Sequence, residues 1–249
     1  MNFKRILFKI SGEALMGAKS FGHDLVAIHK ISEEIEKIYK LGIEICLVIG
    51  GGNIFRGVSV SSELMDRTSA DYMGMLATVM NGIALQSSLE MRGMQTRMHT
   101  AIDMQKICES YIRRRAIKHL ERGKIVIFVA GTGNPFFTTD TASVLKASEM
   151  DCDAIFKGTQ VDGVYDKDPT KFSDAKRYEK ITFDEVIQKN LKVMDPTAFT
   201  LARDTNMPII VFKIAEEDSI LKVIEGKGKY TLICNEEPVK TQKSAVTDL

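Results

Sequence analysis

The chain has 249 residues, of which 44% are hydrophobic and 27% are charged, as is ordinary for a compact protein with a sizeable core. Its 34 Lys and Arg residues nearly balance 33 Asp and Glu residues, giving a formal net charge of +1. This balance excludes a global field that would attract nucleic acid or an anionic membrane, so any affinity for anions must come from local sites. No apolar run approaches a membrane span, and the first 15 residues resemble a strand more than a signal peptide. We therefore expect a cytosolic protein.

The cysteines and histidines are not spaced like disulfide partners or metal ligands. No C-x-x-C pair occurs, so the cysteines are expected to be buried, reduced thiols. The histidines show no zinc-ligand pattern, so solvated or helix-capping roles are expected for them. The residues concerned are Cys46, Cys108, Cys152, Cys234, His23, His29, His99 and His119.

Short β-branched runs alternate with amphipathic stretches along the chain. Nearly continuous apolar strands separated by helices predict an α/β fold, with a central, mostly parallel sheet and helices on both faces. Between the first two runs, apolar residues from Leu25 to Ile38 recur at spacings of three and four, with Asp24 as N-cap and Gly42 as stop. This pattern predicts a helix. The expected strands cover residues 5–10, 43–49, 124–129, 153–157, 208–213 and 230–234.

The stretch 69–91 differs because apolar side chains cover nearly every side of the expected helix. Such a helix has to be buried in a core or against another subunit, so we expect self-association. Segment 160–180 is dense in Asp, Gly, Pro and Lys and is expected to be an irregular excursion or hairpin. We expect one α/β domain over 1–235, with lobes of about 1–150 and 151–235, and a polar tail at 236–249.

Three of the expected strands run into glycine-containing loops. The first ends at Lys9 and continues into Ser11 and Gly12, the second continues into GGGNIFRG at 50–57, and the third into AGTGNPFFTTDTAS at 130–143. In an open parallel sheet, ligands collect outside the carboxyl ends of the strands, where backbone N–H groups point at them. Consecutive glycines let an anion approach closely, and an arginine fork fits phosphate oxygens. The loops predict two phosphate-bearing ligands that face each other across one edge of the sheet.

The known phosphate-binding motifs of two large classes are absent from the sequence. No G-x-x-x-x-G-K-[ST] motif occurs, and GGGNIFRG does not match G-x-G-x-x-G, so P-loop kinases and Rossmann dinucleotide sites fit poorly. A phosphoryl transferase whose phosphate sites are formed by loops, outside both of these classes, remains as the interpretation. In-line transfer needs positive side chains that contact the moving phosphoryl group, a metal ion, and acidic side chains that hold these side chains and the ion in place. The available set is Lys9, Arg56, Asp140 and Asp195.

Several longer motifs closely resemble those of the bacterial uridylate kinases, which have the amino acid kinase fold. They are KISGEAL, VIGGGNIFRG, DYMGMLATVMNG, GTGNPFFTTDTA, KGTQVDGVYDKDP and LKVMDPTAFTLARD, and the resemblance covers about 4–233. It implies ATP-dependent phosphorylation of UMP to UDP, with Mg²⁺ carried by ATP. UMP is then expected in the N-terminal lobe and the ATP nucleoside in the C-terminal lobe. The resemblance also implies a hexamer that GTP activates and UTP inhibits.

The resemblance assigns roles to residues that match the family's motifs. The ATP phosphates are expected at Lys9, Ile10, Ser11, Gly12, Gly52 and Arg56, and the ATP nucleoside at Thr159, Tyr165 and Asp168. UMP is expected at Gly51, Asp71, Thr132, Gly133, Asn134, Pro135, Phe136, Phe137, Thr138 and Thr139, with Asp71 on the ribose. Asp140 and Asp195 are expected to organise Mg²⁺ and the catalytic Lys9. The GTP effect is expected to involve the loop of Gly17, Ala18, Lys19, Ser20, Phe21 and Gly22.

Two alternatives remain open. One is a kinase of the same fold that acts on a carboxylate or carbamate, for which GTGNPFFTTD and Asp71 would have no evident use. The other is a regulatory protein that senses nucleotides and touches DNA through a basic stretch. The basic stretch comprises Arg113, Arg114, Arg115, Lys118 and Arg122. These charges are explained more simply as the solvated face of a helix, so a nucleic-acid partner is not expected.

Overall fold

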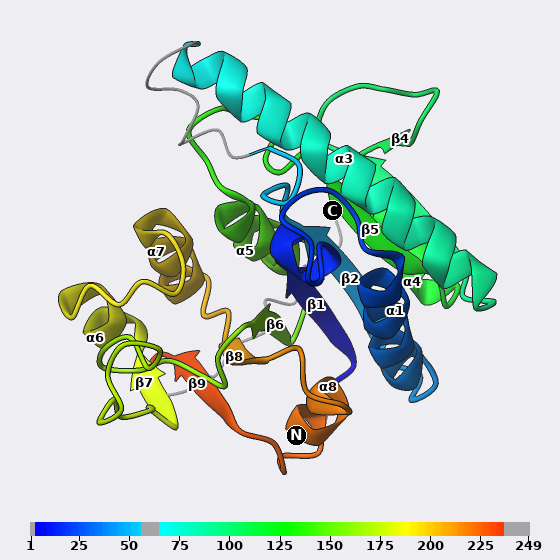
Figure 1. Ribbon diagram of the computed structural model, residues 1–249. Coiled ribbons are helices and arrows are strands. Elements are labelled where there is room, and N and C mark those ends of the chain that lie inside the picture. The colour runs from blue at the N-terminus through cyan, green and yellow to red at the C-terminus, as the bar shows by residue number, and fades with distance from the viewer. Residues whose placement is uncertain (1–2, 56–64, 237–249) are drawn as a thin grey trace, which may run out of the picture.

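The computed structural model describes residues 3–55 and 65–236 (Figure 1). These residues form one nine-stranded sheet in the order β4-β3-β5-β2-β1-β6-β8-β9-β7. Among the described strand pairs, only β8 and β9 are antiparallel, so the predicted mostly parallel α/β sheet is confirmed. The strands are β1 (Arg5–Ile10), β2 (Glu44–Ile49), β3 (Thr96–Thr100), β4 (Glu109–Ser110), β5 (Ile125–Val129), β6 (Ala154–Thr159), β7 (Lys180–Thr182), β8 (Ile209–Lys213) and β9 (Tyr230–Cys234).

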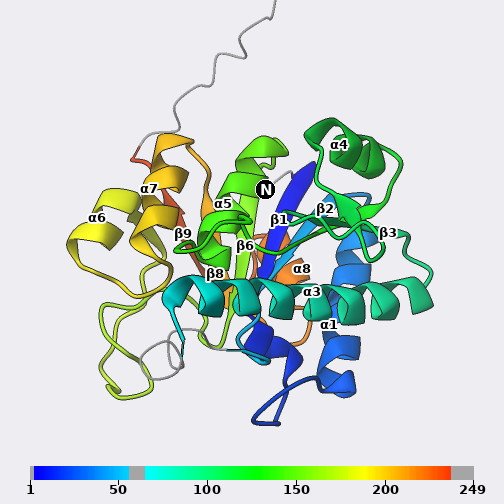
Figure 2. The same ribbon diagram turned by 90° about the horizontal axis from the view of Figure 1, so that it is seen from above.

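Helices cover both faces of the sheet, as Figure 2 shows from above. Alternate residues of β1 face opposite sides: Ile6 and Phe8 join a core with α1, α3 and α8, whereas Leu7 joins a second core with α4, α5, α6 and α7. Such two-sided burial explains the continuous apolar strands. The helices are α1 (Leu25–Tyr39), α3 (Arg67–Met91), α4 (Arg113–Glu121), α5 (Thr139–Glu149), α6 (Phe183–Gln188), α7 (Pro196–Asp204) and α8 (Ser219–Ile224), with a 3-10 turn η1 at Gly12–Leu15.

Local sequence signals set the ends of the first helix as predicted. The Asp24 carboxylate accepts a hydrogen bond from the Val26 N–H and caps α1. Gly42 follows the helix with φ of +75°, a left-handed conformation that glycine adopts without steric cost. The excursion at 160–179 contains no helix or strand, apart from an antiparallel bridge between Tyr165 and Arg177.

Helix α3 is long and only half covered by this chain. Its N-cap is Asp66, and the side chains of Met75, Val79, Leu85 and Leu89 are buried in the core. The opposite side exposes a stripe of apolar side chains, so within this chain only one side of the helix is buried in a core, and the expected burial against another subunit stays a prediction. The stripe comprises Tyr72, Met73, Leu76, Met80 and Ile83.

Three further expectations can be compared with the described residues. No described helix is long and apolar enough to cross a membrane. All four cysteines are free, but only three are buried, since Cys234 at the end of β9 is partly exposed. Arg56 and tail residues 237–249 lie outside the described part of the chain. The division into two lobes stays a prediction.

Candidate active site

Four adjacent parallel strands bring the predicted loops to one edge of the sheet. β5, β2, β1 and β6 are neighbours, so their carboxyl ends lie together. The glycine turns after β1 and β2 touch backbone to backbone, because a Cβ added at Gly12 would lie 2.8 Å from both the Gly50 carbonyl oxygen and the Gly52 nitrogen. A Cβ added at Gly51 would likewise lie 2.8 Å from the Gly74 carbonyl oxygen of α3, whereas the space beside Gly52 is open. The glycines therefore allow two loops and a helix to converge on one point.

Buried amide side chains hold the glycine turns in place. The Asn81 amide of α3 donates to the Gly50 carbonyl and to the Asn53 side chain, each at 2.7 Å. Asn53 in turn donates to the Gly22 carbonyl, and the Gly22 N–H donates to the Asn53 carbonyl. The His23 Nε2 atom lies 2.7 Å from the side-chain oxygen of Asn81. The predicted GTP-linked loop at 17–22 is therefore hydrogen-bonded to the candidate phosphate loop.

A buried ion cluster lies at the centre of the site. The Asp140 carboxylate, at the start of α5, is 2.7 Å from the Lys9 ammonium group and 2.7 Å from that of Lys157. Lys9 lies near the end of β1, and Lys157 lies in the partner position on the neighbouring strand β6. All three side chains are at least 84% buried. The structure thus brings together two predicted residues and adds Lys157, which sequence reasoning did not single out.

Two lysines of the cluster share the Asp140 carboxylate. Burial above all, together with the neighbouring Lys9, lowers the pKa of Lys157 to about 8, against the opposing effects of Asp140 and Asp195. For Asp140, burial acts to raise the pKa, but Lys9 and Lys157 prevail and hold it below its usual range. Asp140 is therefore ionised near pH 7. The two ammonium groups that it holds can also interact with a further anion.

Asp195 joins the loop after β5 to helix α7. One carboxylate oxygen accepts a hydrogen bond from the Ala198 N–H as N-cap of α7, and the carboxylate also accepts from the hydroxyls of Thr138 and Thr141. The Thr138 oxygen in turn accepts from the Asp140 N–H and caps α5. Asp195 therefore fixes the entry to α5, where Asp140 lies.

Helix α3 holds the loop after β5 at two points. The Thr78 hydroxyl accepts from the Ala130 N–H at 2.8 Å, and the Asp71 carboxylate accepts from the Phe136 N–H at 2.7 Å. Ala130 and Phe136 both have positive φ, an uncommon conformation for residues other than glycine that tends to occur at functional sites. Asp71 is also paired with Arg67 at 2.8 Å. Since Asp66 caps α3, Asp71 is not the first-turn acid of this helix.

A cavity of about 220 Å³ lies between the glycine turn, α3 and the loop after β5. Predicted UMP residues that line it are Gly51, Asp71, Thr132, Phe137, Thr138 and Thr139, together with the predicted ATP residue Gly52. Four other loop residues, Gly133 to Phe136, are not among its lining residues. Gly133 packs against Ala101, Asn134 hydrogen-bonds within the loop, and the side chain of Phe136 is exposed. Lining residues not anticipated from the sequence are Phe55, Arg67, Ala70, Gly74, Met75, Thr78 and Gly131.

A second cavity, of about 300 Å³, is lined in part by Asp140. Residues 190–194 line it together with Pro196 and Phe199 of α7. The predicted ATP residues Thr159, Tyr165 and Asp168 are not among its lining residues. The Thr159 hydroxyl bonds to Val161, the Tyr165 hydroxyl to Asp162, and the exposed Asp168 carboxylate to Thr170.

The glycine turns, the buried cluster of Lys9, Lys157 and Asp140, and the two cavities define an α/β protein with room for phosphate-bearing ligands. The profile of the amino acid kinase family matches residues 4–213. A uridylate kinase from Cereibacter sphaeroides is 57% identical over 94% of this chain and 95% of its own length. One from Zymomonas mobilis is 53% identical over 94% of this chain and 97% of its own. The chain belongs to the amino acid kinase family.

Solved structures agree with this assignment. The crystal structure of UMP kinase from Bacillus anthracis matches with a TM-score of 0.91 and 40% identity, over 95% of this chain and 98% of that chain. UMP kinase from Ureaplasma parvum matches with a TM-score of 0.89 and 42% identity, over 94% and 100% of the two chains. The resemblance predicted from the sequence motifs is therefore confirmed.

Proposed function

We propose that this chain transfers the terminal phosphoryl group of ATP to UMP, giving ADP and UDP for pyrimidine nucleotide biosynthesis. The observation that carries the proposal is the buried cluster in which the ammonium groups of Lys9 and Lys157 share the Asp140 carboxylate beside the ends of β1 and β6. A transferring phosphoryl group carries negative charge that these ammonium groups can stabilise. Preorganised ammonium groups in a water-poor site stabilise such charge more strongly than water does.

The cavity beside Asp71 is the proposed UMP site. Its walls combine backbone groups of the loop after β5 with the Asp71 carboxylate and the Arg67 guanidinium group, so fixed donors and acceptors are available to the base and ribose. Asp71 Oδ2 already accepts hydrogen bonds from Arg67 and Phe136, whereas Oδ1 accepts only from Arg67 and has room for another. A ribose hydroxyl donating to Asp71 would therefore join an existing network.

The cavity beside residues 190–194 is the proposed site of the ATP nucleoside, since Asp140 of the cluster is among its lining residues. ATP phosphates would then lie over the turns at 11–12 and 50–52. An oxygen of the UMP phosphate attacks the γ-phosphorus, the bond to the bridging oxygen breaks, and ADP leaves. Transfer is in line and forms no covalent intermediate with the protein.

Mg²⁺ is proposed to arrive with ATP. Both oxygens of Asp140 are within 2.8 Å of lysine ammonium groups, and the Asp195 oxygens accept from Ala198, Thr138 and Thr141. These hydrogen bonds suit the two carboxylates to holding the lysines and the helix ends in place rather than to binding a metal ion directly. The ion would be held by phosphate oxygens and water and would neutralise phosphate charge.

We further propose that the chain assembles into an oligomer, a hexamer by family resemblance, through the apolar stripe of α3. Contiguous exposed apolar side chains at helical spacing favour burial against another subunit. Activation by GTP through the loop at 17–22 has a physical route, because Asn53 and Asn81 link that loop to the Gly50 turn. Inhibition by UTP and a cytosolic location remain predictions.

The proposal is tested by coupled ADP release with ATP and Mg²⁺ across UMP, CMP, dUMP, AMP and GMP. UMP should be turned over far better than CMP or any purine nucleotide, because fixed donors and acceptors distinguish exchanged amino and keto groups. Comparable turnover of UMP and CMP would contradict the assigned base specificity.

A further inference from the structure

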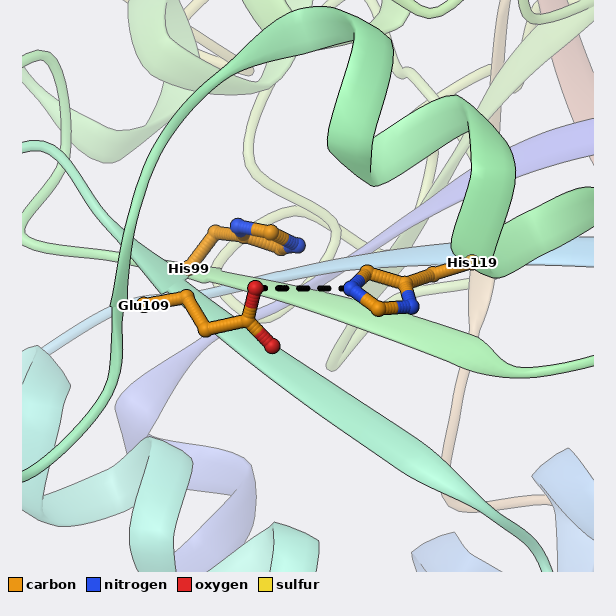
Figure 3. A group of neighbouring side chains, drawn as sticks. All are labelled: His99, Glu109 and His119. Carbon is orange, nitrogen blue, oxygen red and sulfur yellow. Dashed lines mark hydrogen bonds and ion pairs between the residues drawn. The ribbon is translucent and has the colours of Figure 1, made fainter.

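Three side chains with metal-binding groups converge at the edge of the sheet, away from the candidate active site. They are His99 of β3, Glu109 of β4 and His119 in the last turn of α4, and Figure 3 shows both rings and the carboxylate turned toward one another. One ligand atom from each residue lies within 4.8 Å of the other two. The expectation that the histidines are solvated or cap helices is therefore wrong for His99, which is fully buried.

The fold places these residues together although they are ten positions apart in sequence. β3 and β4 are parallel with His99 directly opposite Glu109, so the two side chains emerge on the same face. Helix α4 packs on that face and directs His119 back over the strands, with the two imidazole centres 5.5 Å apart. No zinc-ligand spacing in the sequence could have indicated this group.

The imidazole of His99 lacks the hydrogen bonds that a buried ring normally makes. Within the described residues, neither of its nitrogens has a partner of normal geometry, although the backbone of Ser110 lies near. Because buried polar groups are rarely left unpaired, the His99 ring points to a ligand that accepts the lone pair of one of its nitrogens.

Glu109 has cationic neighbours but no tight ion pair among the described residues. Its carboxylate is 3.4 Å from His119 Nε2, 3.7 Å from Arg115 and 3.8 Å from Arg97. Both arginines are at least 40% exposed, so their guanidinium groups can turn toward solvent without losing a close contact. The carboxylate is itself about one-third exposed, which gives an ion a path from solvent.

We propose that His99, Glu109 and His119 form a binding site for a divalent transition-metal ion of the Zn²⁺ type. Two imidazoles and one carboxylate are a ligand set that zinc uses in proteins, with water in a fourth position. Tetrahedral ligands about 2.0 Å from zinc lie about 3.3 Å apart, close to the observed spacing of Glu109 and His119. The His99 ring has to approach the other two ligands slightly to complete the site.

The chemistry of the three groups selects a cation rather than an anion. A neutral imidazole offers one lone-pair nitrogen to a cation. The Glu109 carboxylate only accepts. A metal ion here would tie the two-residue edge strand β4 to β3 and α4. The site does not depend on the proposed kinase activity, so its test uses no nucleotide.

The experiment is titration of tag-free, metal-stripped protein with Zn²⁺, followed by calorimetry and by thermal unfolding. About one Zn²⁺ should bind per chain, and a hundredfold excess over the dissociation constant should raise the thermal midpoint by about 5–10 °C. Co²⁺ bound at the same site should give the visible absorption of a tetrahedral ion. Mg²⁺ at the same concentration should produce neither effect, because it prefers oxygen ligands.

Glu109→Gln and His119→Gln should each weaken Zn²⁺ binding by at least about 10-fold and abolish the Co²⁺ absorption. The exposed His29 lies elsewhere, on α1, so His29→Gln should bind as wild type does. If wild type binds no Zn²⁺, or if both site variants bind it with unchanged affinity and absorption, the assignment is wrong.

Discussion

Replacing Lys157 with methionine separates what its ammonium group does for catalysis from what it does for stability. The variant leaves Asp140 paired with Lys9 at 2.7 Å, so no buried charge is stranded. In wild type, the pKa of Lys157 falls from 10.5 to about 8, which corresponds to a cost on the order of 3 kcal/mol for holding the charged form. The variant no longer bears this cost, which should offset much of the stability that it loses through packing and hydrogen bonding.

The pH dependence of the effect has a definite sign. Below about pH 8, Lys157 is protonated in both the folded and the unfolded chain, so the full cost is present. Between pH 8 and 10.5 the folded chain holds fewer protons than the unfolded chain, and the free energy of unfolding rises with pH. Wild type should therefore gain stability relative to Lys157→Met over this window, and the variant should lose the least stability near pH 7.

The assay is urea unfolding of both proteins at several pH values from 7 to 10, alongside steady-state kinetics at pH 7. A matched control is Lys146→Met, because Lys146 is also buried and burial also lowers its pKa, but it pairs with Glu149 outside the site. Lys157→Met should lower kcat by roughly 10²–10³-fold, whereas Lys146→Met should keep kcat. A Lys157 variant with wild-type kcat, or a stability difference independent of pH, would refute the reasoning.

Three further variants test separate parts of the site. Lys9→Ala should lower kcat much more than it raises the KM for UMP, since its charge acts on the moving phosphoryl group; an unchanged kcat would make Lys9 structural. Asp71→Ala should lose roughly 10-fold or more activity on UMP and narrow the UMP to dUMP ratio, whereas a fixed ratio with lower thermal stability would leave only the loop-anchoring role. Met80→Glu should reduce the assembly seen by sedimentation, and an unchanged size would exclude the α3 stripe as the interface.

The sequence predicts the central strands and the first helix well because their signals are local. The continuous apolar runs of β1, β2 and β5 and the Asp24 cap each lie within a few residues. Strand β3 escaped prediction because four of the five residues in TRMHT are basic or polar, yet it lies inside the sheet between β4 and β5. Its place is set by pairing with distant segments.

The same contrast applies to the candidate site. Glycine turns after strands indicate where phosphates approach, and the structure brings those turns together as parallel strand ends must. Lys157 could not be singled out in this way, because a lysine in a strand is usually solvated and only its register beside Lys9 reveals the shared carboxylate. The group of His99 and Glu109 likewise depends on strand register rather than on spacing in the sequence.

The most direct test of the proposed phosphoryl transfer is phosphorus NMR of the purified protein mixed with ATP, Mg²⁺ and UMP. The buried cluster beside two cavities predicts that UDP and ADP accumulate in equal amounts and that little ADP forms without UMP. ADP formation without UDP, or transfer only when a carboxylate or carbamate acceptor replaces UMP, would contradict the account.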